Sequence, residues 1–93
     1  MRVLFTAAAQ ADVEEALDWY RARAPAAATR FRDALRGVVA RIAENPKQFP
    51  ILSHQTRRVI LRRFPYVVIF RETRGLAYIV GVFHASRDLR KLH

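Results

Sequence analysis

Two stretches in the first half of the chain carry apolar residues at helical spacing. The first runs from Ala7 to about Arg23, and Thr6 before it supplies a hydroxyl that can cap the helix start. The second begins at Pro25, which suits a first helical turn, and ends at Asn45-Pro46. Because only a residue or two separates them, the pattern predicts an antiparallel helical hairpin.

Strand-like patterns occupy the N-terminus and the second half of the chain. They cover Arg2 to Phe5, Arg57 to Arg63, Tyr66 to Arg71 and Leu76 to Phe83. Thr73-Arg74-Gly75 predicts a tight reversal between the last two, and Tyr66 to Phe70 is apolar on both faces, as in a central strand. The apolar residues from Lys47 to Thr56 follow neither helical nor strand spacing, so we expect a surface connection there.

The order of these elements predicts an α+β fold, β-α-α-β-β-β, with the helical hairpin packed on one face of a small antiparallel sheet. We expect residues 1–93 to form a single domain, with Trp19 and Tyr20 packing in its core or between the helices. The chain has no cysteine, which excludes disulfides and thiolate metal sites. No apolar run approaches the roughly 20 residues that span a bilayer. We therefore expect a cytoplasmic protein without metal or cofactor.

The net charge is +9, and 15 of the 17 basic residues are arginines. Residues 57 to 93 hold nine of the basic residues against two acids, whereas residues 1 to 56 hold eight against six. Arginine favours bidentate contacts to phosphate or carboxylate, so the C-terminal half predicts a basic face for an acidic partner. A bias of the whole composition toward arginine and alanine is the alternative explanation of the charge.

Three local motifs, taken in this order, resemble the RelE/ParE superfamily of bacterial toxins. The first is the helix Ala11-Asp12-Val13-Glu14-Glu15-Ala16-Leu17-Asp18-Trp19-Tyr20. The second is Arg57-Arg58-Val59-Ile60-Leu61-Arg62-Arg63-Phe64-Pro65-Tyr66, and the third is Val82-Phe83-His84-Ala85-Ser86-Arg87-Asp88. The resemblance covers essentially the whole chain. It departs after Arg87, where Leu89 and Leu92 stand in place of the proline and tryptophan of many relatives.

The resemblance implies the toxin half of a type II toxin–antitoxin pair. A cognate antitoxin neutralises such toxins with a flexible segment that folds upon them, and operator DNA is bound only through the antitoxin. Members similar to ParE bind and poison DNA gyrase, and members similar to RelE cleave messenger RNA on the ribosome. A basic nucleic-acid-binding module without toxicity, and a toxin fold that has lost potency, are the alternatives that remain open.

The catalytic pattern of the RelE-like class is incomplete in this chain. The resemblance places Val67, Ala85 and Lys91 where that class has two arginines and a tyrosine that serve RNA cleavage. If the chain were a ribonuclease, His84, Arg87 and Arg62 would carry the reaction; the alternative for His84 and Arg87 is a structural role at the strand end. The gyrase-directed function is therefore the one we predict.

Several arginines are candidates for contacts with the antitoxin or the target. They are Arg57, Arg58, Arg62, Arg63, Arg71, Arg87 and Arg90. A strand that turns its charged side chains to solvent and so resists edge-to-edge aggregation would show the same pattern, and one strand can serve both purposes. His54 and His93 stand alone in polar segments, and we expect both at the surface.

Overall fold

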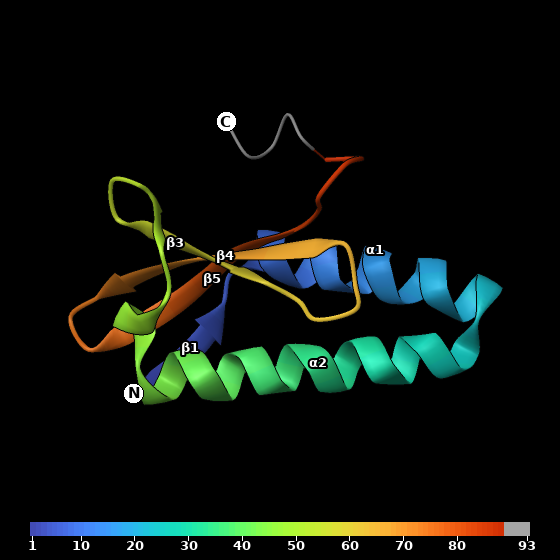
Figure 1. The fold of residues 1–93 in the computed structure, drawn as a ribbon, viewed down its shortest axis with the longest axis horizontal. Helices are drawn as coiled ribbons and strands as arrows, with labels where there is room; N and C mark the ends of the chain where they lie inside the picture. The colour runs from blue at the N-terminus through green and yellow to red at the C-terminus, as the bar shows by residue number, and fades with distance from the viewer. Residues whose placement is uncertain (89–93) are drawn as a thin grey trace.

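The helical hairpin is present, and both of its helices begin and end as predicted. The structure is a computed structural model that describes residues 1–88. Helix α1 (Ala7–Arg23) and helix α2 (Pro25–Glu44) are separated by Ala24 alone and run antiparallel (Figure 1). The Thr6 hydroxyl accepts a hydrogen bond from the Ala9 amide at 3.1 Å and so caps α1.

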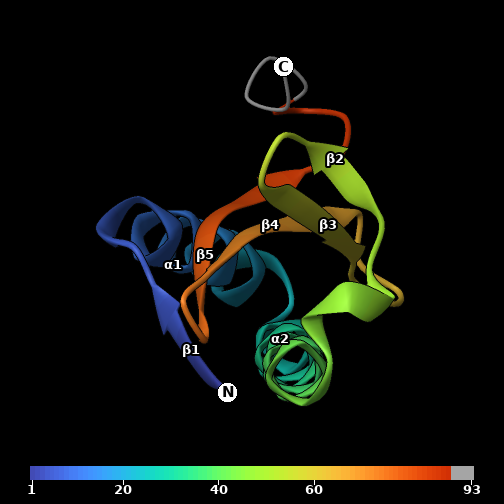
Figure 2. The same ribbon diagram turned by 90° about the vertical axis from the view of Figure 1, so that its left-hand side faces the viewer.

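A five-stranded sheet packs against this hairpin. Its strands are β1 (Arg2–Phe5), β2 (Ile51–Ser53), β3 (Thr56–Ile60), β4 (Tyr66–Thr73) and β5 (Leu76–His84), with a short 3-10 helix η1 (Pro46–Gln48) before β2. The order across the sheet is β1-β5-β4-β3-β2. Figure 2 looks along α2 and shows the sheet twisting over it from β1 at one edge to β2 at the other.

The α+β class is confirmed and the predicted elements occur in the predicted order, but three details of the prediction were wrong. The sheet is mixed rather than antiparallel, because β1 pairs with β5 in parallel while the other pairs are antiparallel. The chain between β1 and β5 passes through both helices and three other strands, so no tight turn fixes the direction in which β1 pairs with β5. The expected surface connection from Lys47 to Thr56 contains η1 and the edge strand β2.

The third strand is also shorter than predicted, since it ends at Ile60 rather than Arg63. Leu61 turns inward and is 2% exposed, and Arg63 adopts a φ of 67°, which ends the extended chain. Arg62 and Arg63 therefore lie in the loop between β3 and β4. The reversal between β4 and β5 is as predicted, with φ angles of 48° at Arg74 and 79° at Gly75.

The core lies between the helical hairpin and one face of the sheet. Phe31, Leu35 and Ile42 of α2 meet Phe70 and Ile79 of the central strands there. A bulge in β5 lets Ile79 and Val82 both face this core, because β4 pairs Ile69 with Gly81 but Phe70 with Ile79. The opposite face of the sheet carries Val67 and Ile69, which are only 9% and 4% exposed although no described helix packs on that face. Within residues 1–88, no helix is long and apolar enough to cross a membrane.

Candidate functional site

The turn after β5 holds His84 in a network of internal hydrogen bonds. The His84 Nδ1 atom accepts the backbone N–H groups of Ser86 at 3.2 Å and Arg87 at 3.1 Å. The Asp88 carboxylate accepts the His84 amide at 2.9 Å, and the Asp88 amide donates to the His84 carbonyl at 3.0 Å. Because backbone amides only donate, Nδ1 is unprotonated and the neutral ring carries its proton on Nε2.

Burial and the nearby Arg87 guanidinium lower the pKa of His84, and Asp88 opposes them. A neutral ring preserves both amide contacts at Nδ1. His84 thus has the properties of a residue that shapes the turn, with its basic nitrogen already engaged by the chain.

Arg87 is held by side chains from two other elements. Its guanidinium donates to the Tyr66 hydroxyl at 2.8 Å and lies 5.1 Å from the centre of the Trp19 ring. Arg23 approaches the same ring to 4.2 Å. Burial raises the pKa of Tyr66, while Arg87 acts in the opposite direction, so the phenol is a neutral acceptor for the guanidinium.

The structure brings His84 and Arg87 together but leaves Arg62 elsewhere. Arg87 lines a small cleft of about 80 Å³ between α1 and the end of β5, which Arg62 does not line. The two residues with catalytic potential are therefore neighbours, and both have internal hydrogen-bond partners. Within residues 1–88, no group of three or more acidic, histidine or cysteine side chains is arranged to hold a metal ion.

The predicted arginine strand divides its residues between two faces of the sheet. Arg57 lies on the helix side and donates to the Phe49 carbonyl at 2.7 Å. Arg58, on the uncovered face, is exposed and pairs with Ile69, while Arg71 lies on the same face two residues further along β4. Ile60, the last residue of β3, is 62% exposed and borders a hollow beside α2. The uncovered face is thus basic at Arg58 and Arg71.

A groove runs between α2 and the β3–β4 loop, and we name it the α2 groove. It consists of two adjoining open hollows of about 660 and 570 Å³, which share Ala34 and Arg62. Its apolar floor includes Ala27, Ala34, Gly37, Val38, Ile60 and Phe64. Its charged rim consists of Arg30, Arg41, Arg62, Arg63 and one acid, Asp33. The groove is several times larger than the cleft beside Arg87.

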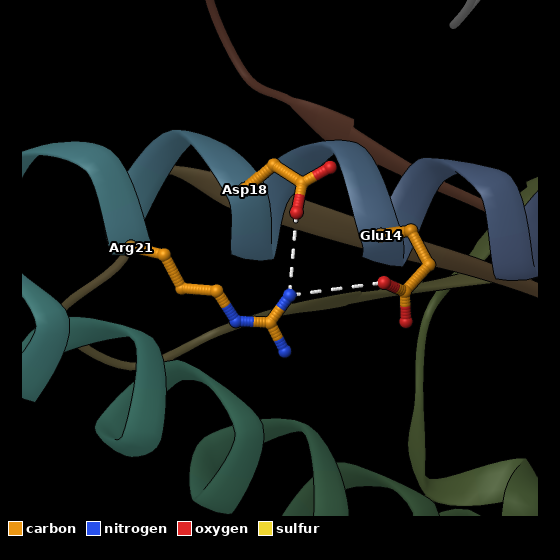
Figure 3. Close-up of polar contacts among 3 residues, drawn as sticks. All are labelled: Glu14, Asp18 and Arg21. Atoms are coloured by element: carbon orange, nitrogen blue, oxygen red, sulfur yellow. Dashed lines mark hydrogen bonds and ion pairs between the residues drawn. The ribbon is translucent and has the colours of Figure 1, made fainter.

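Ion pairing within residues 1–88 takes place on α1. Arg21 lies 3.2 Å from the Asp18 carboxylate and 3.8 Å from that of Glu14, as Figure 3 shows. The arginines of the α2 groove and of the uncovered sheet face have no such partner among the described residues. Their positive charge is therefore available to another molecule.

The comparisons with known proteins agree with the motifs and the fold. A family model for the ParE toxin of type II toxin–antitoxin systems (parDE) matches residues 3–89. The chain belongs to the ParE toxin family. A solved structure titled as the chromosomal ParDE toxin–antitoxin system from P. aeruginosa superposes with a TM-score of 0.81 at 21% identity, covering 92% of this chain and 97% of that one. No curated protein matches the chain in sequence.

The ParE family match confirms the superfamily resemblance, which the motifs had predicted, and identifies the ParE-like branch. Some residues that line the sites of this ParE-like toxin were missed from the sequence. Arg30, Gly37 and Arg41 lie beside Ala34 on one face of α2, at helical spacing, next to the apolar stripe. The sequence signal for these residues was their helical spacing, which forms a second stripe on α2 beside the apolar stripe that faces the core.

The remaining sequence predictions for this ParE-like toxin concern single residues. Tyr20 packs as expected, with its ring 5.6 Å from Phe31. Trp19 does not lie in the core, because it is 39% exposed between two arginines. His54 is exposed, as predicted. Arg90, His93 and the two leucines that replace the family's proline and tryptophan lie outside the described residues.

Proposed function

We propose that this ParE-like toxin acts by binding DNA gyrase and that a cognate antitoxin neutralises it. The observation that carries the proposal is the ParE family match over residues 3–89. The contacts of the candidate catalytic residues support it, because His84 Nδ1 and the Arg87 guanidinium are both engaged within the chain. A toxin that acts by binding requires accessible surface rather than a general base, and two basic surfaces provide it.

We assign the two surfaces to different partners. The uncovered sheet face, with Arg58 and Arg71, is proposed to contact gyrase. The loop arginines Arg62 and Arg63 are proposed to contact the antitoxin. In the proposed complex, only the antitoxin binds operator DNA. We assign structural roles to Arg57 and Arg87 because each donates a hydrogen bond to an oxygen of the same chain. As gyrase is cytoplasmic, so is the proposed site of action, and residues 1–93 act as one domain.

Two parallel assays of the purified toxin without antitoxin test the proposal. One measures DNA supercoiling by gyrase, and the other measures cleavage of messenger RNA on translating ribosomes. We expect supercoiling to be inhibited and the RNA to stay intact. Cleavage of the RNA would instead make the toxin an endonuclease and move His84, Arg87 and Arg62 to its catalytic centre.

A matched pair of variants tests where gyrase binds. Arg58→Glu reverses a charge on the uncovered face, and Arg32→Glu makes the same change at an exposed position of α2. We expect Arg58→Glu to weaken gyrase inhibition by at least about tenfold and Arg32→Glu by less than about threefold. Equal losses would point to net charge rather than to this face. If binding to naked DNA instead falls steeply with salt while gyrase stays active, the chain is a nucleic-acid-binding module.

A further inference from the structure

Two tight turns lie near each other at one end of the sheet. Residues 54–55 form the turn between β2 and β3, and residues 74–75 form the turn between β4 and β5. Thr56, the first residue of β3, pairs with Arg71, two residues before β4 ends at Thr73. Figure 1 shows both turns at the left-hand end of the sheet, away from the loop between β3 and β4.

Three exposed arginines belong to this end of the sheet. Arg71 lies on the uncovered face of β4, Arg58 lies diagonally across from it on β3, and Arg74 occupies the β4–β5 turn. Diagonal neighbours on one face of a sheet are about 7–8 Å apart. Within residues 1–88 none of these three side chains has an ion-pair or hydrogen-bond partner. We name this surface the hairpin end, and it consists of His54, Gln55, Arg58, Arg71 and Arg74.

The acids of the described chain lie away from these arginines. All six acids in residues 1–56 belong to α1 and α2, which pack against the other face of the sheet (Figure 2). Glu72 points to that helix side as well, because it follows Arg71 in the strand. Asp88 accepts the His84 amide at the opposite end of β5. An anion can therefore bind the hairpin end without displacing a carboxylate.

An open hollow of about 630 Å³ lies beside Arg71, and its lining is entirely polar. The residues that line it are Ser53, His54, Gln55, Thr56 and Arg71. The Thr56 hydroxyl donates to the Ser53 carbonyl at 2.9 Å and lies 3.1 Å from the Ser53 hydroxyl, so both hydroxyls hold the turn together. His54, Gln55 and Arg71 are left to donate hydrogen bonds to a ligand.

This lining suits the phosphates of a nucleic acid better than an acidic peptide. Peptides that dock on proteins anchor themselves by apolar side chains in pockets, and no apolar residue lines this hollow. Phosphate contacts are made by arginine and by polar side chains such as glutamine. A single strand also needs aromatic faces for its bases, and Tyr78, the aromatic residue paired with Arg71, is half-buried. A duplex keeps its bases paired, so backbone contacts suffice.

We propose that the hairpin end binds the phosphate backbone of the DNA duplex that gyrase holds. This inference rests on the proposed function, because gyrase brings the duplex to the toxin. The uncovered face then meets the complex of gyrase and DNA, with its hairpin end on the DNA. Contacts to phosphate carry no sequence information, so recognition of the operator stays with the antitoxin.

The first test titrates a fluorescein-labelled DNA duplex of about 20 base pairs with the full-length toxin at several salt concentrations, followed by fluorescence anisotropy. Each neutralised phosphate contributes about −0.9 to the slope of log affinity against log salt concentration. Arg71→Gln and Arg74→Asn should therefore each make the slope shallower by about one. Each should also weaken binding by roughly five- to tenfold at about 0.1 M salt, equally for two duplexes of unrelated sequence.

The control Arg32→Gln removes the same charge from an exposed position of α2, on the helix side, and should change the slope by less than about 0.3. Both test variants should fold, because Arg71 is exposed and Arg74→Asn creates Asn-Gly, a pair favoured in such a two-residue turn. Circular dichroism checks this. Unchanged DNA binding by the folded test variants would overturn the proposal, and so would an equal loss in Arg32→Gln. Tighter binding of a single strand of the same sequence would make the hairpin end a single-strand site instead.

A second measurement separates this inference from the proposed function. The affinity of the toxin for gyrase is measured with and without the duplex. We expect the duplex to strengthen wild-type binding by at least about tenfold, and Arg74→Asn to lose most of that gain while Arg32→Gln keeps it. No gain in the wild type, or an equal gain in Arg74→Asn, refutes the DNA contact and leaves the function standing if supercoiling is still inhibited. If the toxin spares gyrase, the proposed function fails, while the duplex titration still decides whether the hairpin end binds DNA.

Discussion

The hydrogen bond between Arg87 and Tyr66 joins the turn after β5 to the start of β4, and its strength can be measured with a double-mutant cycle. The Arg87 guanidinium donates to the Tyr66 hydroxyl at 2.8 Å, and Tyr66 is only 4% exposed. Hydrogen bonds to charged groups contribute about 1.5–3 kcal/mol. Because the Arg87 side chain is exposed and can be hydrated when its partner is lost, we expect Tyr66→Phe to cost about 1 kcal/mol, below that range.

Arg87→Ala should cost more than Tyr66→Phe. It removes the same hydrogen bond, leaves the buried Tyr66 hydroxyl without its donor, and ends the contact with Trp19, which contributes about 0.5–1 kcal/mol at an exposed site. We expect a loss of about 2 kcal/mol. The double variant should lose little more than Arg87→Ala alone, which gives a coupling energy of about 1 kcal/mol.

Urea unfolding followed by circular dichroism measures all four proteins without relying on Trp19, whose fluorescence changes with Arg87. At a slope of about 1 kcal/mol per molar urea for a chain of this size, the coupling corresponds to about 1 M in the midpoint. Losses that add within about 0.3 kcal/mol would refute the reasoning. A strong loss of gyrase inhibition in Arg87→Ala with unchanged stability would instead place Arg87 in the target surface.

Three further changes test separate parts of the structure. Because the pKa of His84 is lowered in the folded protein, the unfolded chain takes up a proton on this residue first, at about pH 6.5. The free energy of unfolding should therefore keep the His84 contribution above that pH and lose it as the pH falls toward the folded pKa. His84→Asn should flatten this part of a profile of unfolding free energy against pH, measured by urea unfolding. Thr6→Ala removes the cap of α1 and should lower the free energy of unfolding by about 1 kcal/mol in the same assay, whereas Thr6→Ser should restore most of it. Gly37→Ala should raise the thermal midpoint, because alanine is more favourable than glycine in a helix by about 0.5–1 kcal/mol and its Cβ meets no neighbour; a lower midpoint would mean that the groove is not open.

The bounds of the helices could be predicted closely because their signals are local. Thr6 caps α1, Pro25 opens α2, and Asn45 ends it, and each acts within a few residues of its own position. The β4–β5 hairpin could also be predicted from the sequence, since Arg74-Gly75 permits the positive φ angles that a two-residue turn requires.

What could not be predicted depends on contacts between distant residues. The parallel pairing of β1 with β5 joins Arg2 to Leu76, and no local pattern states the direction of such a pair. The edge strand β2 has three exposed residues and therefore no alternation to detect. The contact of Arg87 with Tyr66 spans 21 positions, so no local pattern in the sequence indicates it.

The positions of the arginines also bear on whether the net charge of +9 has a function or only reflects composition. Arg21, Arg57 and Arg87 each bind an oxygen of the chain, so they contribute to the fold. The arginines of the α2 groove have no such partner within residues 1–88, and at this net charge they repel one another. Replacing Arg62 with glutamate should therefore leave stability unchanged or raise it slightly, whatever it does to binding. If charge reflects composition alone, the variant gains stability and keeps its partners. A variant that keeps its stability but loses the antitoxin shows that the unpaired charge is retained for recognition.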